Sequence, residues 1–513
     1  MRSFKITIPL AATMVLTSAP TVRAEMTTEQ EALTIAQNYL SLVLVNEGDW
    51  GGFDAAEVAA VQEFTRGERT LGYFCRVHPR GFLVVSLHKE LAPVKAYSVW
   101  SDLDPEADEG LTDLLKDRIE RVFDAIEEKL GREIEPDDKL DDLLEINYRA
   151  ASEVLAAKSF DPQDYQEPQR ARAAGMDYQE GEILLTSRWH QKPPYNNDCP
   201  DHGCTWPDHG FFNTNAKVGC VATAGAQIMR YWCWPPYGAG GSPYDDTYDW
   251  PNMCGEYNWH DDSGWFNDEN GVPVTWDQIN AAAELGREIG RAADMDYGCD
   301  SSSTPTHNME GVYESHYRYS TSCYVDYRDD YDDPVDWFEV IKGEFNMNRP
   351  VQYRIPGHSM VGDGWKEEWI GDDYYWYHMN YGHRRDSEDI WYALDELAGG
   401  DPDDEYLIKR IVPVQAIGSD IAGSYPLPSF PYRYFDQDAS GSNATFDSGQ
   451  LLQILKGGFV LRSIGSASES VTFCGSPSAN TRFFLYGDPD TQIRIRISGG
   501  GLSLYGGGEM VIH

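Results

Sequence analysis

The pattern of apolar and polar positions divides the chain into stretches of helical and strand-like periodicity. Apolar residues recur every three to four positions in ALTIAQNYLSLVL (32–44), which Thr27 and Gln30 precede as a capping box. The same spacing marks an amphipathic helix in LTDLLKDRIERVFDAIEEKLG, which ends at Gly131. Between them, GYFCRVHPRGFLVVSLHK predicts two strands joined by a Pro-Arg-Gly turn. These elements predict a small α/β unit at the N-terminal end of the chain.

A polar, proline-containing stretch at 155–182 is typical of an exposed linker, and a second unit follows it over 181–416. Two helices are predicted there, one that begins at Cys220 and one in WDQINAAAELGREIGRAADM. After Pro350 the pattern becomes strand-like in VQYRI, HSMVGDGW, YYWYHMNYG and IWYAL. Helices followed by strands predict an α+β domain.

Residues 417–513 differ from the rest because short alternating stretches are interrupted by glycines. A proline-rich hinge, SYPLPSFPY, precedes them, and segments such as TRFFLYGD and TQIRIRISGG are typical of short strands. The segment is therefore predicted to be an all-β accessory domain. Glycan binding, surface attachment and simple packing all stay open as its role.

The first 24 residues have the features of an export signal. Arg2 and Lys5 give a positive start, an apolar stretch spans 6–16, and Val22-Arg23-Ala24 provides a small-x-small cleavage site. No later run is apolar enough to predict a membrane span. We therefore expect a signal peptide over 1–24, a prodomain and linker over 25–180, and a secreted or periplasmic mature protein.

Composition narrows the function classes further. The 513 residues carry a formal net charge of −43, which argues against binding to nucleic-acid phosphates because that binding requires clustered Lys and Arg. The acidic residues fit a solvated surface, and no calcium-binding Asp-x-Asp-x-Asp-Gly loop is present.

The nine cysteines include at least one thiol without an intramolecular partner, because their number is odd. Six of them lie between Cys199 and Cys299. An export signal predicts a compartment where disulfides persist, so an unpaired thiol there indicates chemistry. Proximity in sequence suggests the pairs Cys199–Cys204 and Cys233–Cys254.

Four interpretations of Cys220, in KVGCVATAGAQIMRYWCWP, stay open. It could be a buried structural residue, a disulfide partner or a nucleophile. It could also lie near a metal site formed by Cys199, His202, Cys204 and His209, although the spacing matches no usual zinc site. The nucleophile hypothesis has physical support, because unpaired N–H groups at a helix start stabilise a thiolate.

A nucleophilic cysteine also needs a base, and His358 in PGHSMVGDGW supplies a candidate at the edge of a predicted strand. Asn380, in YHMNYG, could hold the imidazole in the useful tautomer. Cysteine early, histidine late and asparagine last is the order of papain-type enzymes.

The segments that carry these residues resemble the streptopain-like secreted cysteine peptidases. The resemblance covers about residues 183–400 and rests on WHQKPPYNNDCP, VGCVATAGAQIMRYWCWP, IGRAADMDYGCDSSST, PGHSMVGDGW and YWYHMNYG. GFLVVSLHKELAPVKAYS resembles the inhibitory prodomain of the same family. The resemblance implies a papain-like fold, protein or peptide substrates, the chain's own prodomain as inhibitor, and neither a metal nor an organic cofactor.

The resemblance also implies roles for single residues. Cys220 is expected to be the nucleophile and His358 the general base and acid, while the Gln191 side chain lines the oxyanion hole. Asn380 is expected to orient His358. Substrate contacts are expected from Ser301, Ser302, Gly357 and Tyr381.

One departure from the family pattern affects the function. The family has Trp-Gly-Trp-Gly-Gly after the asparagine, whereas this chain has Tyr381-Gly382-His383-Arg384-Arg385. The leading hypothesis is a self-processing cysteine endopeptidase. The alternatives are a catalytically impaired homologue that acts as a secreted protein- or glycan-binding scaffold, and an acyl-transfer enzyme that uses the same Cys–His pair.

Overall fold

The structure is a computed structural model of the chain. It describes residues 26–135, 138, 140–165, 180–207, 212–232, 234–235, 237–260, 263–331, 333–383, 390–394 and 405–413, and six short strands between 434 and 497. The predicted signal peptide, most of the predicted linker and most of the predicted accessory domain lie outside the described residues.

The N-terminal part combines three α-helices with four antiparallel strands, as the α/β prediction requires. Its elements are α1 (Glu29–Glu47), β1 (Glu57–Arg66), β2 (Arg69–His78), β3 (Phe82–Ser86), β4 (Val94–Ser98), α2 (Gly110–Leu130) and α3 (Arg149–Leu155). The capping box of α1 is formed by Thr28 and Glu31 and not by Thr27 and Gln30, so the predicted helix start was one residue early. Gly131 ends α2 in the left-handed conformation, as predicted.

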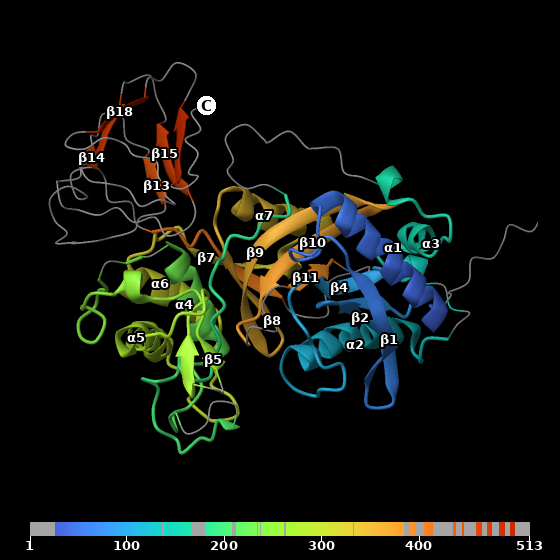
Figure 1. The fold of residues 1–513 in the computed structure, drawn as a ribbon, viewed down its shortest axis with the longest axis horizontal. Coiled ribbons are helices and arrows are strands. Elements are labelled where there is room, and N and C mark those ends of the chain that lie inside the picture. Colours follow the sequence, from blue (N-terminus) through green and yellow to red (C-terminus); the bar gives the residue numbers. More distant parts are fainter. Residues whose placement is uncertain are drawn as a thin grey trace, which may run out of the picture.

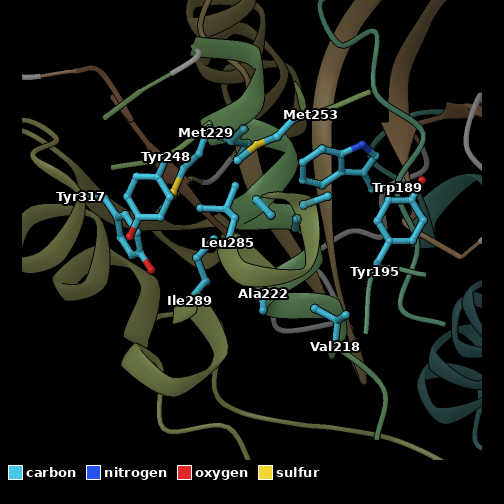
Figure 2. Close-up of a cluster of buried hydrophobic side chains, with 14 of the residues drawn as sticks. Trp189, Tyr195, Val218, Ala222, Met229, Tyr248, Met253, Leu285, Ile289 and Tyr317 are labelled. Atoms are coloured by element: carbon cyan, nitrogen blue, oxygen red, sulfur yellow. The ribbon is translucent and has the colours of Figure 1, made fainter. Parts of the chain in front are cut away.

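A helical lobe follows, built from α4 (Cys220–Trp232), α5 (Trp276–Ala292) and α6 (Asn308–Tyr317), with the small hairpin β5 (Asn258–His260) and β6 (Trp265–Asn267). Both predicted helices are confirmed. Figure 2 shows the apolar cluster between them, where Leu285 and Ile289 of α5 lie beside Ala222 and Met229 of α4. Eleven residues of α4 are buried, which fixes the helix firmly in the lobe.

One ten-stranded sheet joins the N-terminal part to the strands that follow the helical lobe, in the order β1-β2-β3-β4-β11-β10-β9-β8-β12-β7. Its later strands are β7 (Tyr324–Tyr327), β8 (Val351–Ile355), β9 (His358–Trp369), β10 (Asp373–Asn380), β11 (Ile390–Ala393) and β12 (Tyr406–Lys409), and α7 (Pro334–Asn346) precedes β8. The strands predicted after Pro350 are confirmed. Tyr97 of β4 pairs with Trp391 of β11, so the N-terminal part continues the later sheet (Figure 1).

Each face of this sheet carries one apolar core. On one face, Phe123 of α2 and Phe338 of α7 belong to the same cluster as Tyr377 of β10. On the other face, α1 and α3 pack against Trp376. Because both cores contain residues from the N-terminal part and from the later part, burial of apolar area holds the two parts together.

Short strands also lie in the C-terminal segment. They are β13 (Tyr434–Gln437), β14 (Ala444–Thr445), β15 (Gly458–Ser463), β16 (Glu469–Phe473), β17 (Arg482–Gly487) and β18 (Ile493–Ile497). An all-β accessory domain stays a prediction. Among the helices of the described residues, none has the length and apolarity needed to cross a membrane.

Candidate active site

Cys220 is the first residue of α4, and Gly219 fixes the turn before it. Gly219 has φ +93°, and a Cβ there would lie 2.8 Å from the Met295 side chain and 3.0 Å from the Ser302 carbonyl oxygen. Only glycine fits such a close, left-handed position. The Thr223 N–H donates to the Gly219 carbonyl at 2.9 Å, which begins the helix. The Cys220 N–H therefore lies in the first turn, where helices leave their N–H groups without an intrahelical partner.

His358 is the first residue of β9, and a two-residue turn brings it to that position. Pro356 and Gly357 connect β8 to β9, and Ile355 pairs with His358 across the hairpin. Gly357 has φ +74°, which a proline-glycine turn requires at its second residue. The exposed Gly357 directly precedes His358 in the chain, and its contact with substrate stays a prediction.

The Gln352 side chain connects the segments that carry Cys220 and His358. Its Nε2 donates at 3.0 Å to the carbonyl of Val221, which follows Cys220, and at 3.0 Å to the hydroxyl of Ser359, which follows His358. Its Oε1 accepts from the Tyr313 hydroxyl at 2.9 Å. This buried amide fixes the helix start against β9, and its position in VQYRI gave no sequence signal of that role.

The orientation of the His358 ring is set by a backbone carbonyl. His358 Nε2 lies 2.8 Å from the Tyr381 carbonyl oxygen. A carbonyl only accepts, so Nε2 carries the hydrogen and Nδ1 of the neutral ring is left as the base. The Tyr381 ring is buried and lies parallel to the imidazole, with centroids 6.0 Å apart.

The hydrogen bonds described for Asn380 join it to groups other than His358, and its expected role in orienting His358 stays a prediction. Its Nδ2 donates to the Ser187 carbonyl at 3.0 Å, and its Oδ1 accepts from the Gly382 N–H at 3.1 Å. The Gln227 amide also bonds to it. Asn380 thus holds the turn that follows it, and the neighbouring Tyr381 carbonyl reaches the imidazole.

Desolvation favours the neutral forms of both Cys220 and His358. It raises the pKa of the Cys220 thiol, although backbone groups of Ser359, Val221 and Cys220 itself oppose the rise. Burial also lowers the pKa of His358 to about 4, against the opposing hydrogen bond to Tyr381.

The remaining predicted residues lie on the segments next to the start of α4. The Val218 N–H donates to the Gln191 carbonyl at 3.0 Å, so Gln191 lies beside the chain that leads to Cys220. The Ser302 hydroxyl donates to the Lys217 carbonyl at 2.7 Å, while Ser301 is exposed. Figure 2 shows Val218 near the N-terminal end of α4.

His383 belongs to the departure from the family pattern, and the structure places it against His358. Its ring stacks on that of His358 at 4.7 Å between centroids, with 21° between the planes. Burial lowers the pKa of His383 well below the ordinary 6.5, and the charges of His358, Lys217 and Lys192 lower it further.

The cysteine pairing differs from the predicted pairs. Cys204 forms a disulfide with Cys299, 95 positions away, while Cys199 and Cys254 are free. The pairs Cys199–Cys204 and Cys233–Cys254 were therefore wrong, because proximity in sequence does not report distance in the fold. Cys204 is also unavailable as a metal ligand, and His209 lies outside the described residues.

An acidic cluster lies elsewhere in the helical lobe, formed by Asp246, Glu284 and Glu288. Its oxygen atoms lie within 4.8 Å of one another. Burial raises the pKa of both glutamates to about 7, so protons compete with any cation at neutral pH. The Tyr248 hydroxyl already donates to Glu288 at 2.7 Å.

Two family models match the chain. Residues 189–392 match the peptidase C10 family, and residues 24–122 match the Spi protease inhibitor family. The first match contains Cys220, His358, Gln191 and Asn380.

The matching proteins include streptopain from Streptococcus pyogenes serotype M28, which is 25% identical over 352 residues, or 63% of this chain and 74% of streptopain. The thiol protease/hemagglutinin PrtT of Porphyromonas gingivalis is 27% identical over 186 residues, or 33% of this chain and 19% of PrtT. A solved structure of a mutant prointerpain A fragment from Prevotella intermedia is 20% identical, with a TM-score of 0.47, and the match covers 69% of this chain and 99% of that one.

Proposed function

The chain belongs to the peptidase C10 (streptopain) family and carries a Spi-type inhibitor prodomain, and from this premise we propose that it is a cysteine endopeptidase made as a self-processing zymogen. Cys220 is the proposed nucleophile and His358 the proposed general base and acid. The substrates are proteins or peptides.

The observation that carries this proposal is the joint anchoring of Cys220 and His358. Gln352 donates to the residues that follow each of them, at 3.0 Å in both cases. The Tyr381 carbonyl fixes the imidazole so that Nδ1 is the basic nitrogen. A thiol at a helix N-terminus, held on a segment that is anchored to the segment of such a base, supports nucleophilic catalysis by cysteine.

In the first half of the reaction, His358 Nδ1 takes the Cys220 proton. The thiolate then attacks the scissile carbonyl carbon, and a carbon–sulfur bond forms. The carbon–nitrogen bond breaks, and the amine leaves with the proton from the His358 imidazolium. In the second half, His358 takes a proton from water, which attacks the thioester and frees both the acid product and the thiol.

The negative oxygen of the tetrahedral intermediates needs donors. We assign this role to the Cys220 N–H, which lies in the first turn of α4, and to the Gln191 side-chain amide. One good side-chain donor of this kind contributes about 3 kcal/mol to transition-state stabilisation. Ser301, Ser302, Gly357 and Tyr381 are the proposed substrate contacts around this centre.

The N-terminal part is the proposed inhibitor of the same chain. It continues the peptidase sheet through β4 and β11 and shares both apolar cores with it. In this state the imidazole is buried and Cys220 is half-buried. Desolvation raises the pKa of the thiol and lowers that of the imidazole, which opposes the ion pair and fits a latent enzyme. Cleavage of the segment between α3 and Gln191 would release the inhibitor.

Export and the C-terminal segment complete the proposal. The basic start, apolar stretch and Val22-Arg23-Ala24 site support a signal peptide and a secreted or periplasmic enzyme. The role of residues 417–513 as an all-β accessory domain, with glycan contact as one option, is proposed on the strand pattern alone.

The test compares the wild-type chain with Cys220→Ala, both produced as the full proform. Intact mass is followed over time. Loss of an N-terminal fragment that ends between residues 155 and 182, in the wild type alone, would support Cys220 as the nucleophile.

If both chains stay whole, or both are cut alike, self-processing fails and a protein- or glycan-binding scaffold becomes the better function. Reaction of the thiol with an alkylating reagent then separates an inactive scaffold from an enzyme that another protease must activate.

A further inference from the structure

Two lysines lie on the segments that lead into the candidate active site. Lys192 directly follows Gln191, and Lys217 lies three residues before Cys220. Lys217 is fixed at both ends, because its N–H donates to the Gly298 carbonyl at 3.1 Å and its Nζ to the Asp300 carbonyl at 2.5 Å. Lys217 therefore connects the chain that leads to Cys220 with the segment that contains Ser301 and Ser302.

The positive charge of Lys217 is balanced only in part, because the carboxylates of Asp300 and Glu109 act on it from beyond ion-pair distance. Neither Lys192 nor Lys217 forms an ion pair with any residue that the structure describes. The Val218 N–H donates to the Gln191 carbonyl at 3.0 Å, which brings the segments that carry Lys192 and Lys217 together. The charges of both lysines lower the pKa of His383, which stacks on His358. Burial and the charge of Lys192 lower the pKa of Lys217. Two neighbouring lysines without an ion-pair partner among the described residues are unusual in a chain whose net charge is −43.

The N-terminal part contributes one carboxylate, that of Glu109, to the electrostatics of Lys217. Its segment from Asp102 to Glu109 contains five carboxylates in eight residues. The Trp100 ring lies against the guanidinium of Arg188, with 5.3 Å from Cζ to the ring centroid, three residues before Gln191. Glu109, at the N-cap of α2, acts on Lys217 and opposes the lowering of its pKa.

We propose that Lys192 and Lys217 form a subsite that binds an acidic side chain of the peptide substrate, and that Glu109 of the acidic 102–109 segment faces this subsite in the zymogen. The inference rests on the proposed function and specifies its substrate class as peptides with Glu or Asp near the cleaved bond. A carboxylate there would receive charge-assisted hydrogen bonds that no neutral side chain can accept equally well.

The experiment uses the full chain after self-processing. Internally quenched peptides that differ only by Glu or Gln are compared, with the changed residue moved through each position around the cleaved bond. At one position, kcat/KM is expected to be about tenfold higher for Glu, the lower end of what hydrogen bonds between charged groups contribute. This preference should decrease with added salt, because salt screens the two charges.

Variants of Lys192 and Lys217 test whether these two residues cause the preference for Glu peptides. Lys192→Gln/Lys217→Gln is expected to bring the rates for the two peptides within about twofold of each other, and Lys217→Glu to favour a Lys peptide over the Glu peptide. The matched control is Lys342→Gln, since Lys342 already pairs with Glu339 and Glu367; it should keep the Glu preference.

The part of the proposal that concerns Glu109 of the prodomain is tested by a separate pair of variants. Glu109→Gln is expected to speed self-processing relative to Glu128→Gln, which removes an exposed carboxylate from the other end of α2. Equal processing rates of the two variants would overturn that part.

The remaining outcomes separate the inference from the proposed function. A wild-type enzyme that cleaves Glu and Gln peptides equally at every position and salt concentration overturns the subsite alone. A chain that cleaves no peptide, and that processes no differently from Cys220→Ala, overturns the proposed function.

Discussion

The imidazole rings of His358 and His383 lie face to face, 4.7 Å apart between centroids. The resemblance stated from the sequence would place a tryptophan at the position of His383, and in this chain the His383 ring covers that of His358. It also adds a second group that can take a proton. The thiolate–imidazolium pair needs a positive charge on His358, and a second positive charge on His383 would repel it.

We therefore expect His383→Phe to change how kcat/KM falls at acidic pH. Burial and neighbouring cations hold the pKa of His383 well below 6.5, so it gains its proton only at acidic pH. In the wild type, the fall of kcat/KM on acidification should include this extra proton and be steeper. In His383→Phe the fall should have the slope of one proton. Identical slopes in both proteins would show that His383 does not titrate with the pair.

Asn380→Ala is expected to lower kcat by about tenfold or more, with a smaller change in KM, because positioning errors act on the chemical step. The substitution removes the acceptor of the Gly382 N–H and so loosens the turn that carries the Tyr381 carbonyl. Asn380→Asp keeps an acceptor oxygen and should restore part of the rate. Steady-state kinetics of the three processed proteins give the comparison, and an unchanged kcat in Asn380→Ala would contradict it.

The positions of Cys220 and His358 could be read from the sequence because local chemistry fixes both. A glycine before a run of small residues marks the start of α4, and Pro356-Gly357 marks the turn before β9. The partner of His358 could not be read, because a backbone carbonyl has no residue signature. The disulfide between Cys204 and Cys299 and the pairing of Tyr97 with Trp391 join distant segments, and only the tertiary fold brings such residues together.

Arg118→Met should lower the free energy of unfolding of the proform by more than the loss of an exposed ion pair would. Arg118 of α2 reaches the buried Glu405 at 2.8 Å across the boundary between the N-terminal part and the peptidase strands. Burial alone would raise the pKa of Glu405, and Arg118 and Arg328 outweigh it. Removing one partner of a buried pair costs about 3 kcal/mol.

The measurement is urea unfolding of the full chain in the Cys220→Ala background, which prevents self-processing. Arg121→Met is the control on the same helix, since Arg121 pairs with Asp117 and its side chain is 40% exposed. That control should cost about 1 kcal/mol or less. Equal losses in both variants would mean that the Arg118–Glu405 pair does not hold the two parts together.

Glu288→Gln should stabilise the proform at alkaline pH and have little effect in acid. Burial and the neighbouring carboxylates Asp246 and Glu284 raise the folded-state pKa of Glu288 from 4.5 to about 7, against the opposing hydrogen bond from Tyr248. Below the unfolded-state pKa both states are protonated, so the residue costs nothing. As pH rises through the window from 4.5 to 7, the unfolded chain releases the proton first, and stability is lost.

Glutamine at position 288 keeps an acceptor for the Tyr248 hydroxyl and removes the charge. Urea unfolding at several pH values in the Cys220→Ala background should show a gain of about 1–2 kcal/mol near pH 8 that disappears near pH 4. A gain that is constant across this range would instead reflect packing around Tyr248.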